Sequence, residues 1–235
     1  VNNSVLWVES DLKISSKAIF SFDMTRENSY ELDGYDVVTK LINLAPSGSD
    51  HDGTVYSGSL SYTGLNRIDT HSLYGRSFYS NIYTTIPLPT GFTTNSKTND
   101  TFFVFYFNGH DNGTTNIIAG TGLTGLDHQL AFMTTNKLAY SDDTTVMGTT
   151  PHLVIYNYYY IDGGTTLYIQ ARQIFDDGTT VDHTGSTAIT VRTASQSDAY
   201  LFYPGTDMSR WEGSIYEYSY LEDLTAEERS TIYND

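Results

Sequence analysis

Apolar and polar residues alternate along short stretches of this chain, and clusters of turn residues separate the stretches. A period of two is typical of β-strands with one side against a core. Residues 165–175 show it clearly, with Leu167, Ile169 and Ala171 on one side and Arg172 on the other. The pattern predicts further strands. They span 116–120, 129–133, 137–140, 152–160, 179–182, 188–191, 200–203 and 213–220.

Residues 101–107 are apolar on both alternating sides, which predicts a central strand covered on both faces. Only the end of the chain indicates a helix, because Thr225 and Glu228 have the spacing of a capping box. We expect Ile232 and Tyr233 to pack back on a sheet. Many short strands with one late helix predict a single all-β domain over residues 1–235, a sandwich or barrel, in which residues 1–40 add a strand or an arm.

Charge narrows the kinds of partner. The chain has 28 Asp and Glu against 12 Lys and Arg, a formal net charge of −16. Nucleic acids are bound largely through Lys and Arg contacts to phosphate, so we expect no nucleic-acid partner. We also expect no membrane insertion, because the chain has no run of about 18 apolar residues. Cysteine is absent, which excludes disulfides and thiolate metal sites.

Three segments carry a family resemblance. The first is the loop Asn43–Val55, with its Ser-Gly and Asp-Gly steps. The second is a strand pair that includes Gly75–Phe78 and Thr101–Phe107, and the third is the closing segment Trp211–Arg229. In this order they resemble the concanavalin A-like lectin/glucanase superfamily, in its laminin-G-like branch. One departure is Tyr106, which stands where the family often has Trp.

The resemblance implies a concanavalin A-like jelly-roll β-sandwich of two curved antiparallel sheets, with the ligand site on the concave sheet or its rim loops. Such domains commonly bind glycans or proteins, often with calcium. The resemblance therefore implies calcium as a cofactor and a glycan or surface polysaccharide as a partner. It also implies an extracellular, cell-surface or virion location, since these domains occur in lectins, bacterial surface proteins and phage fibres.

Aromatic residues are the first candidates for a ligand site, because sugar faces stack on rings while sugar hydroxyls pair with polar groups. The candidates are Tyr156, Tyr158 and Tyr160 on one side of a predicted strand, Asn108, His110 and Asp111 in the turn after the apolar strand, and Trp211 before the last strand. A competing interpretation is that these tyrosines pack in the core with their hydroxyls at its edge. For Trp211 the alternative is to plug one end of the sandwich.

Asp50 and Asp52 are the candidate metal ligands. Calcium takes about six to eight oxygen ligands, which flexible loops supply from carboxylates and carbonyls. The two aspartates flank His51 just before Gly53, although no loop has the full calcium-loop spacing. Aspartate also favours turns by bonding its own backbone. The turn role and the calcium role are both open for this pair.

Catalytic patterns do not stand out in the sequence. A glycosidase needs two carboxyl groups about 5–10 Å apart, and the glucanase relatives place theirs in an E-x-D-x-x-E pattern that this chain lacks. We therefore predict a non-catalytic carbohydrate-binding or adhesion domain, displayed on a surface as part of a phage or virion fibre or decoration protein. Single glycan sites are weak, so we expect an oligomer or array. The alternatives are a structural virion or surface-assembly protein, or a glycan-cleaving hydrolase or lyase.

Overall fold

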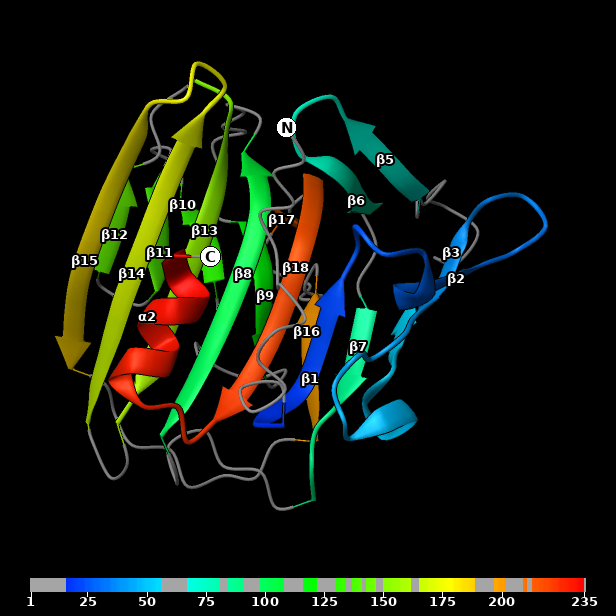
Figure 1. Cartoon of the computed structure of the whole chain (residues 1–235), viewed down its shortest axis with the longest axis horizontal. Helices are drawn as coiled ribbons and strands as arrows, with labels where there is room; N and C mark the ends of the chain where they lie inside the picture. Colours follow the sequence, from blue (N-terminus) through cyan, green and yellow to red (C-terminus); the bar gives the residue numbers. More distant parts are fainter. Residues whose placement is uncertain are drawn as a thin grey trace.

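The computed structural model shows two antiparallel β-sheets that face each other, with one helix on the outer side of the eight-stranded sheet, which lies in front in Figure 1. This confirms the predicted all-β sandwich with a short C-terminal helix. The structure describes residues 16–55, 67–80, 84–90, 98–107, 116–121, 130–133, 137–140, 143–146, 150–161, 165–188, 197–201, 209–210 and 213–234.

The front sheet has eight strands. From one edge to the other they are β15 (Thr180–Ala188), β14 (Thr166–Phe175), β13 (His152–Tyr160), β8 (Asn99–Phe107), β18 (Gly213–Glu222), β6 (Gly75–Ser80) and β5 (Arg67–His71), with β1 (Ala18–Asp23) also paired to β18.

The second sheet has ten strands and lies behind the first. In order they are β12 (Asp143–Val146), β11 (Lys137–Tyr140), β10 (Leu130–Met133), β9 (Asn116–Thr121), β16 (Asp198–Leu201), β7 (Thr84–Pro87), β4 (Gly53–Val55), β3 (Val38–Leu41) and β2 (Tyr30–Leu32), with the two-residue β17 (Ser209–Arg210) parallel to β9. Short 3-10 turns span Glu27–Ser29 and Gly48–His51.

Most of the predicted strands are confirmed with small shifts at their ends. β8 pairs with β13 on one side and β18 on the other, as expected for an apolar central strand. The turn after β14 is a hairpin formed by Asp176, Asp177 and Gly178, and Gly178 takes a φ of 86° there. β15 is longer than predicted, because it pairs along β14 although few of its residues are apolar. Of the predicted strand 188–191, only Ala188 is described.

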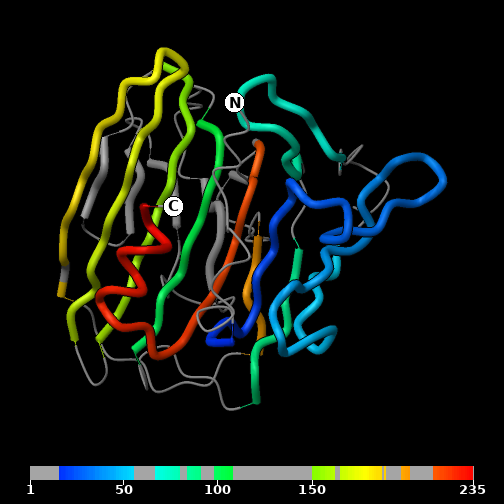
Figure 2. Tube along the Cα trace, in the orientation of Figure 1, coloured from blue at the N-terminus to red at the C-terminus, as the bar shows by residue number. Residues whose placement is uncertain are grey.

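Residues 16–41 add strands to both sheets. Two strands share one edge of β18. β6 pairs with its first residues, Gly213 to Ile215, and β1 pairs with the residues from Glu217 onward. Tyr216 lies at the irregularity between the two halves. β2 and β3 form a hairpin that projects from the side of the sandwich (blue in Figure 2). Residues 1–15 lie outside the described part of the chain.

Apolar side chains fill the space between the sheets. Phe103, Phe105 and Phe107 of β8 point inward and pack with residues such as Phe78 and Ile86. Full burial of a side chain of this kind is worth about 1.5–3 kcal/mol. A second apolar cluster lies on the outer face of the eight-stranded sheet. That face must therefore be covered as well.

Helix α2 (Ala226–Asn234) covers part of this outer face (Figure 1). Tyr233 is buried there, and Ile232 is packed against the same apolar cluster, so the predicted packing of both is confirmed. A helix of this length is marginal without tertiary contacts. Packing on the sheet and the polar contacts described next hold it in place.

A buried ion pair anchors α2 to the sheet. The guanidinium of Arg229 bonds both carboxylate oxygens of Asp100 on β8, with Nη2 2.9 Å from Oδ2. Asn157 also donates to Asp100 at 3.3 Å, and the Arg229 guanidinium lies 3.9 Å from the centre of the Tyr159 ring. Burial raises the pKa of Asp100, and Arg229 opposes that shift. Removing either charge would leave the other buried without a counter-charge.

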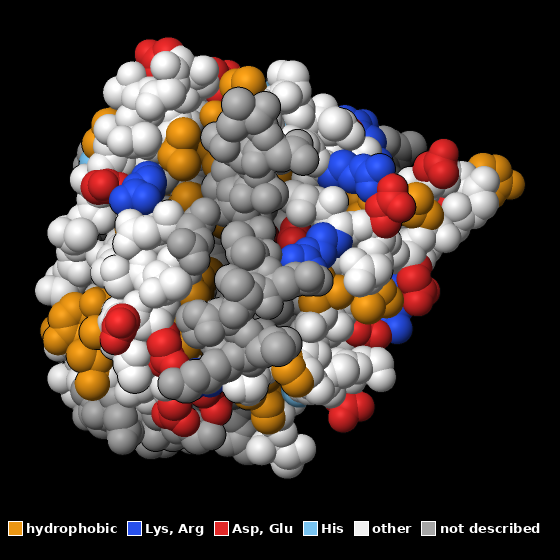
Figure 3. Space-filling model, in the orientation of Figure 1, with side chains coloured by type: hydrophobic (Ala, Val, Ile, Leu, Met, Phe, Trp, Pro, Cys, Tyr) orange, Lys and Arg blue, Asp and Glu red, His pale blue; other side chains and the backbone are white. Residues whose placement is uncertain are grey.

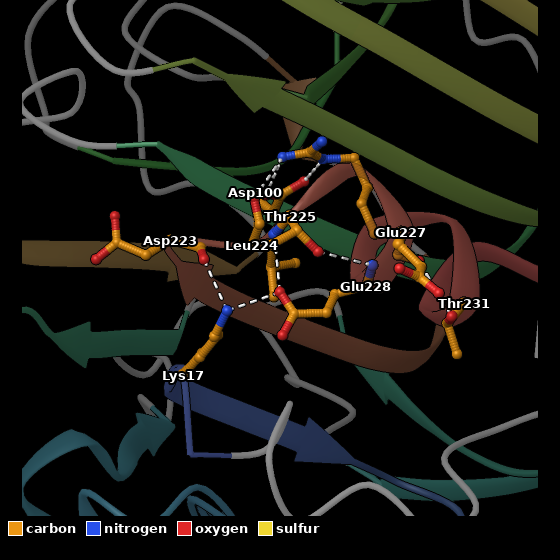
Figure 4. Close-up of polar contacts among 9 residues, drawn as sticks. Lys17, Asp100, Asp223, Leu224, Thr225, Glu227, Glu228 and Thr231 are labelled. Carbon is orange, nitrogen blue, oxygen red and sulfur yellow. Dashed lines mark hydrogen bonds and ion pairs between the residues drawn. The ribbon is translucent and has the colours of Figure 1, made fainter.

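The start of α2 is fixed by a second set of contacts (Figure 4). Thr225 and Glu228 form the predicted capping box: the Thr225 amide donates to the Glu228 carboxylate at 2.8 Å, and the Glu228 amide donates to the Thr225 hydroxyl at 3.2 Å. Lys17 lies 2.6 Å from the same carboxylate. The Lys17 ammonium and the Thr225 amide hold the pKa of Glu228 at about 2.

We expect Arg229→Met to lower the free energy of unfolding by about 3–5 kcal/mol, because it leaves Asp100 buried and unpaired. Adding Asp100→Leu in the same chain should recover most of that loss. Urea unfolding of the two variants and the unaltered protein measures both effects. If the free energy of unfolding of Arg229→Met alone lay within about 1 kcal/mol of that of the unaltered protein, the anchoring role would be contradicted.

Acid should weaken the contacts of Glu228. Its folded pKa lies below the ordinary value of 4.5, so its stabilising effect is complete above about pH 4.5 and is lost as pH falls toward 2. The stability difference between the unaltered protein and Glu228→Gln should therefore shrink across that range. Urea midpoints at several pH values measure it. Glu227→Gln, at an exposed neighbouring position, is the control and should show a small, constant difference.

Candidate functional site

The three tyrosines predicted as ligand contacts lie in the core. Tyr156, Tyr158 and Tyr160 are 1%, 3% and 0% exposed and belong to the cluster between the sheets. Tyr156 is paired with Phe103 and Ala171, which places all three residues on the inner face. Because a ligand on the outside cannot reach these rings, their predicted contact role is wrong in this structure. The competing interpretation, packing in the core, is the one observed.

The other predicted ligand residues cannot be placed. Asn108, His110, Asp111 and Trp211 lie outside the described residues. Their roles stay predictions. The first three follow directly after β8 in the chain, only a few residues beyond Tyr106.

The two candidate metal ligands differ in their surroundings. Asp52 is 8% exposed; its carboxylate accepts the Asn43 amide at 2.8 Å and lies 2.5 Å from the Lys40 ammonium. Asp50 is exposed. Asp52 thus ties the loop that begins at Asn43 to Lys40 of β3, which is a structural role. Within the described ranges, no three His, Asp or Glu side chains gather as a metal site would require. Calcium binding remains a prediction.

A different group of side chains meets on the outer face of the eight-stranded sheet. The hydroxyls of Tyr74 and Tyr106 donate to Asp176, at 3.1 Å from Oδ1 and 3.3 Å from Oδ2 respectively. The ring of His71 lies 4.9 Å from the centre of the Tyr74 ring and 4.7 Å from that of Tyr106. We call these four residues the aromatic–carboxylate cluster. Asp176 is exposed and the three rings are partly exposed.

Three separate elements bring the cluster together. His71 and Tyr74 come from the turn between β5 and β6, which Gly75 closes with a φ of 81°. Tyr106 lies near the end of β8, and Asp176 directly follows β14. β8 and β14 both pair antiparallel with β13, so they run the same way and end on the same side of the sheet (Figure 1). Tyr74 and Asp176 are 102 residues apart in sequence.

Electrostatics keep both phenols protonated. Burial raises the pKa of Tyr74 far above its usual value, and the bond to Asp176 raises it further. Burial and the Asp176 charge likewise raise the pKa of Tyr106. Tyr216 packs edge-on against Tyr74, and burial raises its pKa to about 12. At neutral pH the phenols therefore donate to a carboxylate rather than compete with it as anions.

The cluster has the elements of a small-ligand site. It combines apolar ring surface with a few fixed polar groups, which is the usual composition of such sites. None of its four residues is among the predicted glycan contacts, and the sequence pattern singles out only Asp176, as an acidic turn residue that could also bind calcium. The available signals were Tyr106, the residue with a polar tip on the outer side of an apolar strand, and the acidic turn at Asp176. Their meeting with Tyr74 depends on a long-range contact.

The fold is shared with known binding domains. No protein-family model and no curated protein matches the chain. Among solved structures, the binding domain of botulinum neurotoxin DC in complex with SialylT matches with a TM-score of 0.54 and 9% identity over 94% of this chain and 51% of that chain. The binding domain of botulinum neurotoxin serotype C1 matches with a TM-score of 0.54 and 9% identity, over 94% of this chain and 53% of that chain. The neurotoxin DC binding domain in complex with rat synaptotagmin II matches with a TM-score of 0.50 and 8% identity, over 94% of this chain and 52% of that chain.

These values show a common sheet-rich fold, and the chain spans about half the length of each of these structures. No family match supports the finer assignment to the laminin-G-like branch. As a separate finding, none of the described helices is long and apolar enough to span a membrane.

Substitutions should separate core tyrosines from cluster tyrosines. We expect Tyr156→Ala to lower the free energy of unfolding by about 3–5 kcal/mol, because it opens a cavity in the core. Tyr106→Ala removes a partly exposed ring and one hydrogen bond, so its expected cost is about 1–2 kcal/mol. Chemical unfolding of both variants measures the difference. Equal losses would contradict the assignment of Tyr106 to the surface.

Proposed function

We propose that this chain is a non-catalytic glycan-binding domain and that the aromatic–carboxylate cluster is its ligand site. The observation that carries the proposal is one exposed carboxylate, Asp176, held by two tyrosine hydroxyls beside the rings of His71, Tyr74 and Tyr106. A sugar offers an apolar C–H face to rings and hydroxyls to a carboxylate. A preformed group of this kind also loses little entropy when a ligand binds.

The shared fold supports the proposal at the level of architecture. One neighbour is a toxin binding domain in complex with SialylT, and this chain matches about half of that domain. Fold likeness alone does not assign a function. The proposal therefore rests on the cluster.

Binding fits the cluster better than cleavage. Both oxygens of Asp176 accept a phenol hydrogen bond, which holds the carboxylate as a fixed acceptor. A glycosidase instead uses one carboxyl group as an acid and a second about 5–10 Å away as a base or nucleophile. The residues of the cluster supply a single carboxylate.

A surface location and repeated display belong to the same proposal. A site of four side chains binds one sugar unit weakly, and display of several copies raises avidity by about 10²–10⁴. An extracellular, cell-surface or virion setting, including a phage fibre or decoration protein, provides such display. Asn108, His110 and Asp111 follow Tyr106 in the chain and are proposed as further contacts.

A glycan array tests the proposal, run with calcium and again with a chelator. We expect the unaltered protein to retain glycans and Tyr106→Ala to weaken retention about ten- to a hundredfold, because it removes a stacking ring and releases Asp176. Tyr35→Ala is the matched control. Tyr35 is 88% exposed on the β2–β3 turn, so its removal should leave both folding and binding unchanged.

Two results would contradict the proposal. One is a folded protein that retains no glycan on the array, which favours the structural-assembly alternative. The other is retention that Tyr106→Ala and Tyr35→Ala leave equally unchanged, which places the ligand elsewhere on the molecule. If the unaltered protein retains glycans with calcium and loses them when the chelator is added, calcium takes part in binding.

A further inference from the structure

We infer that the aromatic–carboxylate cluster selects uncharged or amine-bearing sugars and rejects sugars that carry carboxylate or sulfate groups. This inference rests on the proposed function and names the ligand class of the same site. Two independent observations carry it. One is the direction of the hydrogen bonds inside the cluster, and the other is the state of the cations on the surrounding strands.

The hydrogen bonds leave mainly acceptors for a ligand. Tyr106 directs its O–H to Asp176, and Tyr74 directs its O–H to Asp176 at 3.1 Å with the Ile174 carbonyl as a second, longer acceptor at 3.4 Å. Both protons are therefore used inside the protein, and the phenol oxygens and the carboxylate remain as acceptors. His71 Nδ1 accepts the Leu73 amide at 3.2 Å, so the neutral ring carries its proton on Nε2. That N–H is the one donor these four side chains still offer. A sugar hydroxyl both donates and accepts, and an ammonium donates, whereas a carboxylate or sulfate only accepts.

On the described strands that supply or flank the cluster, each Lys or Arg is already paired with a carboxylate. Among the strands that supply or flank it, β8 and β18 contain no Lys or Arg, and β5, β6 and β14 contain one each. Each of these three arginines forms an ion pair: Arg67 with Asp69 at 2.6 Å, Arg76 with Glu27 at 2.7 Å, and Arg172 with Asp182 at 2.7 Å.

The surface view agrees with this pairing. On the face shown in Figure 3, outside the grey atoms, the Lys and Arg side chains are scattered and most lie beside Asp or Glu. An acidic sugar would bring a negative charge to Asp176, with Asp177 next in the chain. Water screens much of this repulsion at an exposed site, so we expect discrimination of at least about tenfold rather than complete exclusion.

The test compares matched pairs of immobilised sugars: lactose with 3′-sialyllactose, oligogalactose with oligogalacturonate, and chitosan oligomers as the amine-bearing member. The unaltered protein should bind the neutral or amine member at least about tenfold more tightly than its acidic counterpart. Raising the salt concentration should reduce that ratio, because salt screens charges at the surface.

Asp176→Asn removes the charge at the site. It should weaken binding of neutral and amine-bearing sugars several-fold, because hydrogen bonds to a charged group are the stronger ones. It should also reduce the neutral-to-acidic ratio at least about threefold. Asp36→Asn is the matched control with the same chemical change. Asp36 is exposed on the β2–β3 turn with a φ of 59°, which Asn tolerates, so the ratio should stay unchanged.

The outcomes separate this inference from the function on which it rests. Preferred binding of the acidic members that Tyr106→Ala abolishes would overturn the inference and leave the glycan site standing. An equal effect of Asp176→Asn and Asp36→Asn on the ratio would overturn it as well, because overall charge would then be the cause. No sugar bound, or binding unaffected by Tyr106→Ala, would overturn the proposed function and the inference together.

Discussion

The central strands of the front sheet are apolar on both faces, so this sheet has to be covered twice. The second sheet covers the inner face. On the outer face the cover is α2, a helix of nine residues whose own stability is marginal. The ion pair of Arg229 with Asp100 crosses from helix to sheet and is almost fully buried. A buried pair fixes geometry more than it adds stability, and here it sets where the helix lies.

The position of α2 leaves another part of the same face for the aromatic–carboxylate cluster. Tyr74 and Tyr106 border the apolar cluster that also contains Tyr233 of the helix. Tyrosine suits this boundary, because its ring packs against apolar neighbours while its hydroxyl bonds a polar group. Asp176 provides that group, so one exposed carboxylate satisfies two half-covered phenols. The aromatic–carboxylate cluster, which is proposed to bind a ligand, thus also borders the apolar cluster on the outer face.

Local sequence patterns carry much of the fold and little of the site. Alternation placed β13 and β14, and the spacing of Thr225 and Glu228 placed the start of α2, because each signal depends on near neighbours. Alternation does not say which side of β13 faces the core, because both sides carry large residues. Tyr156 therefore lies on the inner face although the pattern suggests it as a ligand contact. The cluster depends on contacts between distant segments, which no local pattern reports.

The pairing of β1 with β18 has a consequence for how the chain reaches its native state. Ser21 and Ser219 share a hydrogen bond across 198 residues, and β18 also fills a place between β8 and the strands β6 and β1. A ribosome therefore releases β1 and β8 long before their common neighbour exists. The sheet therefore stays incomplete while most of the chain is made, and closing such long loops afterwards is slow. Until then the unpaired edges of β1 and β8 need protection from neighbouring chains.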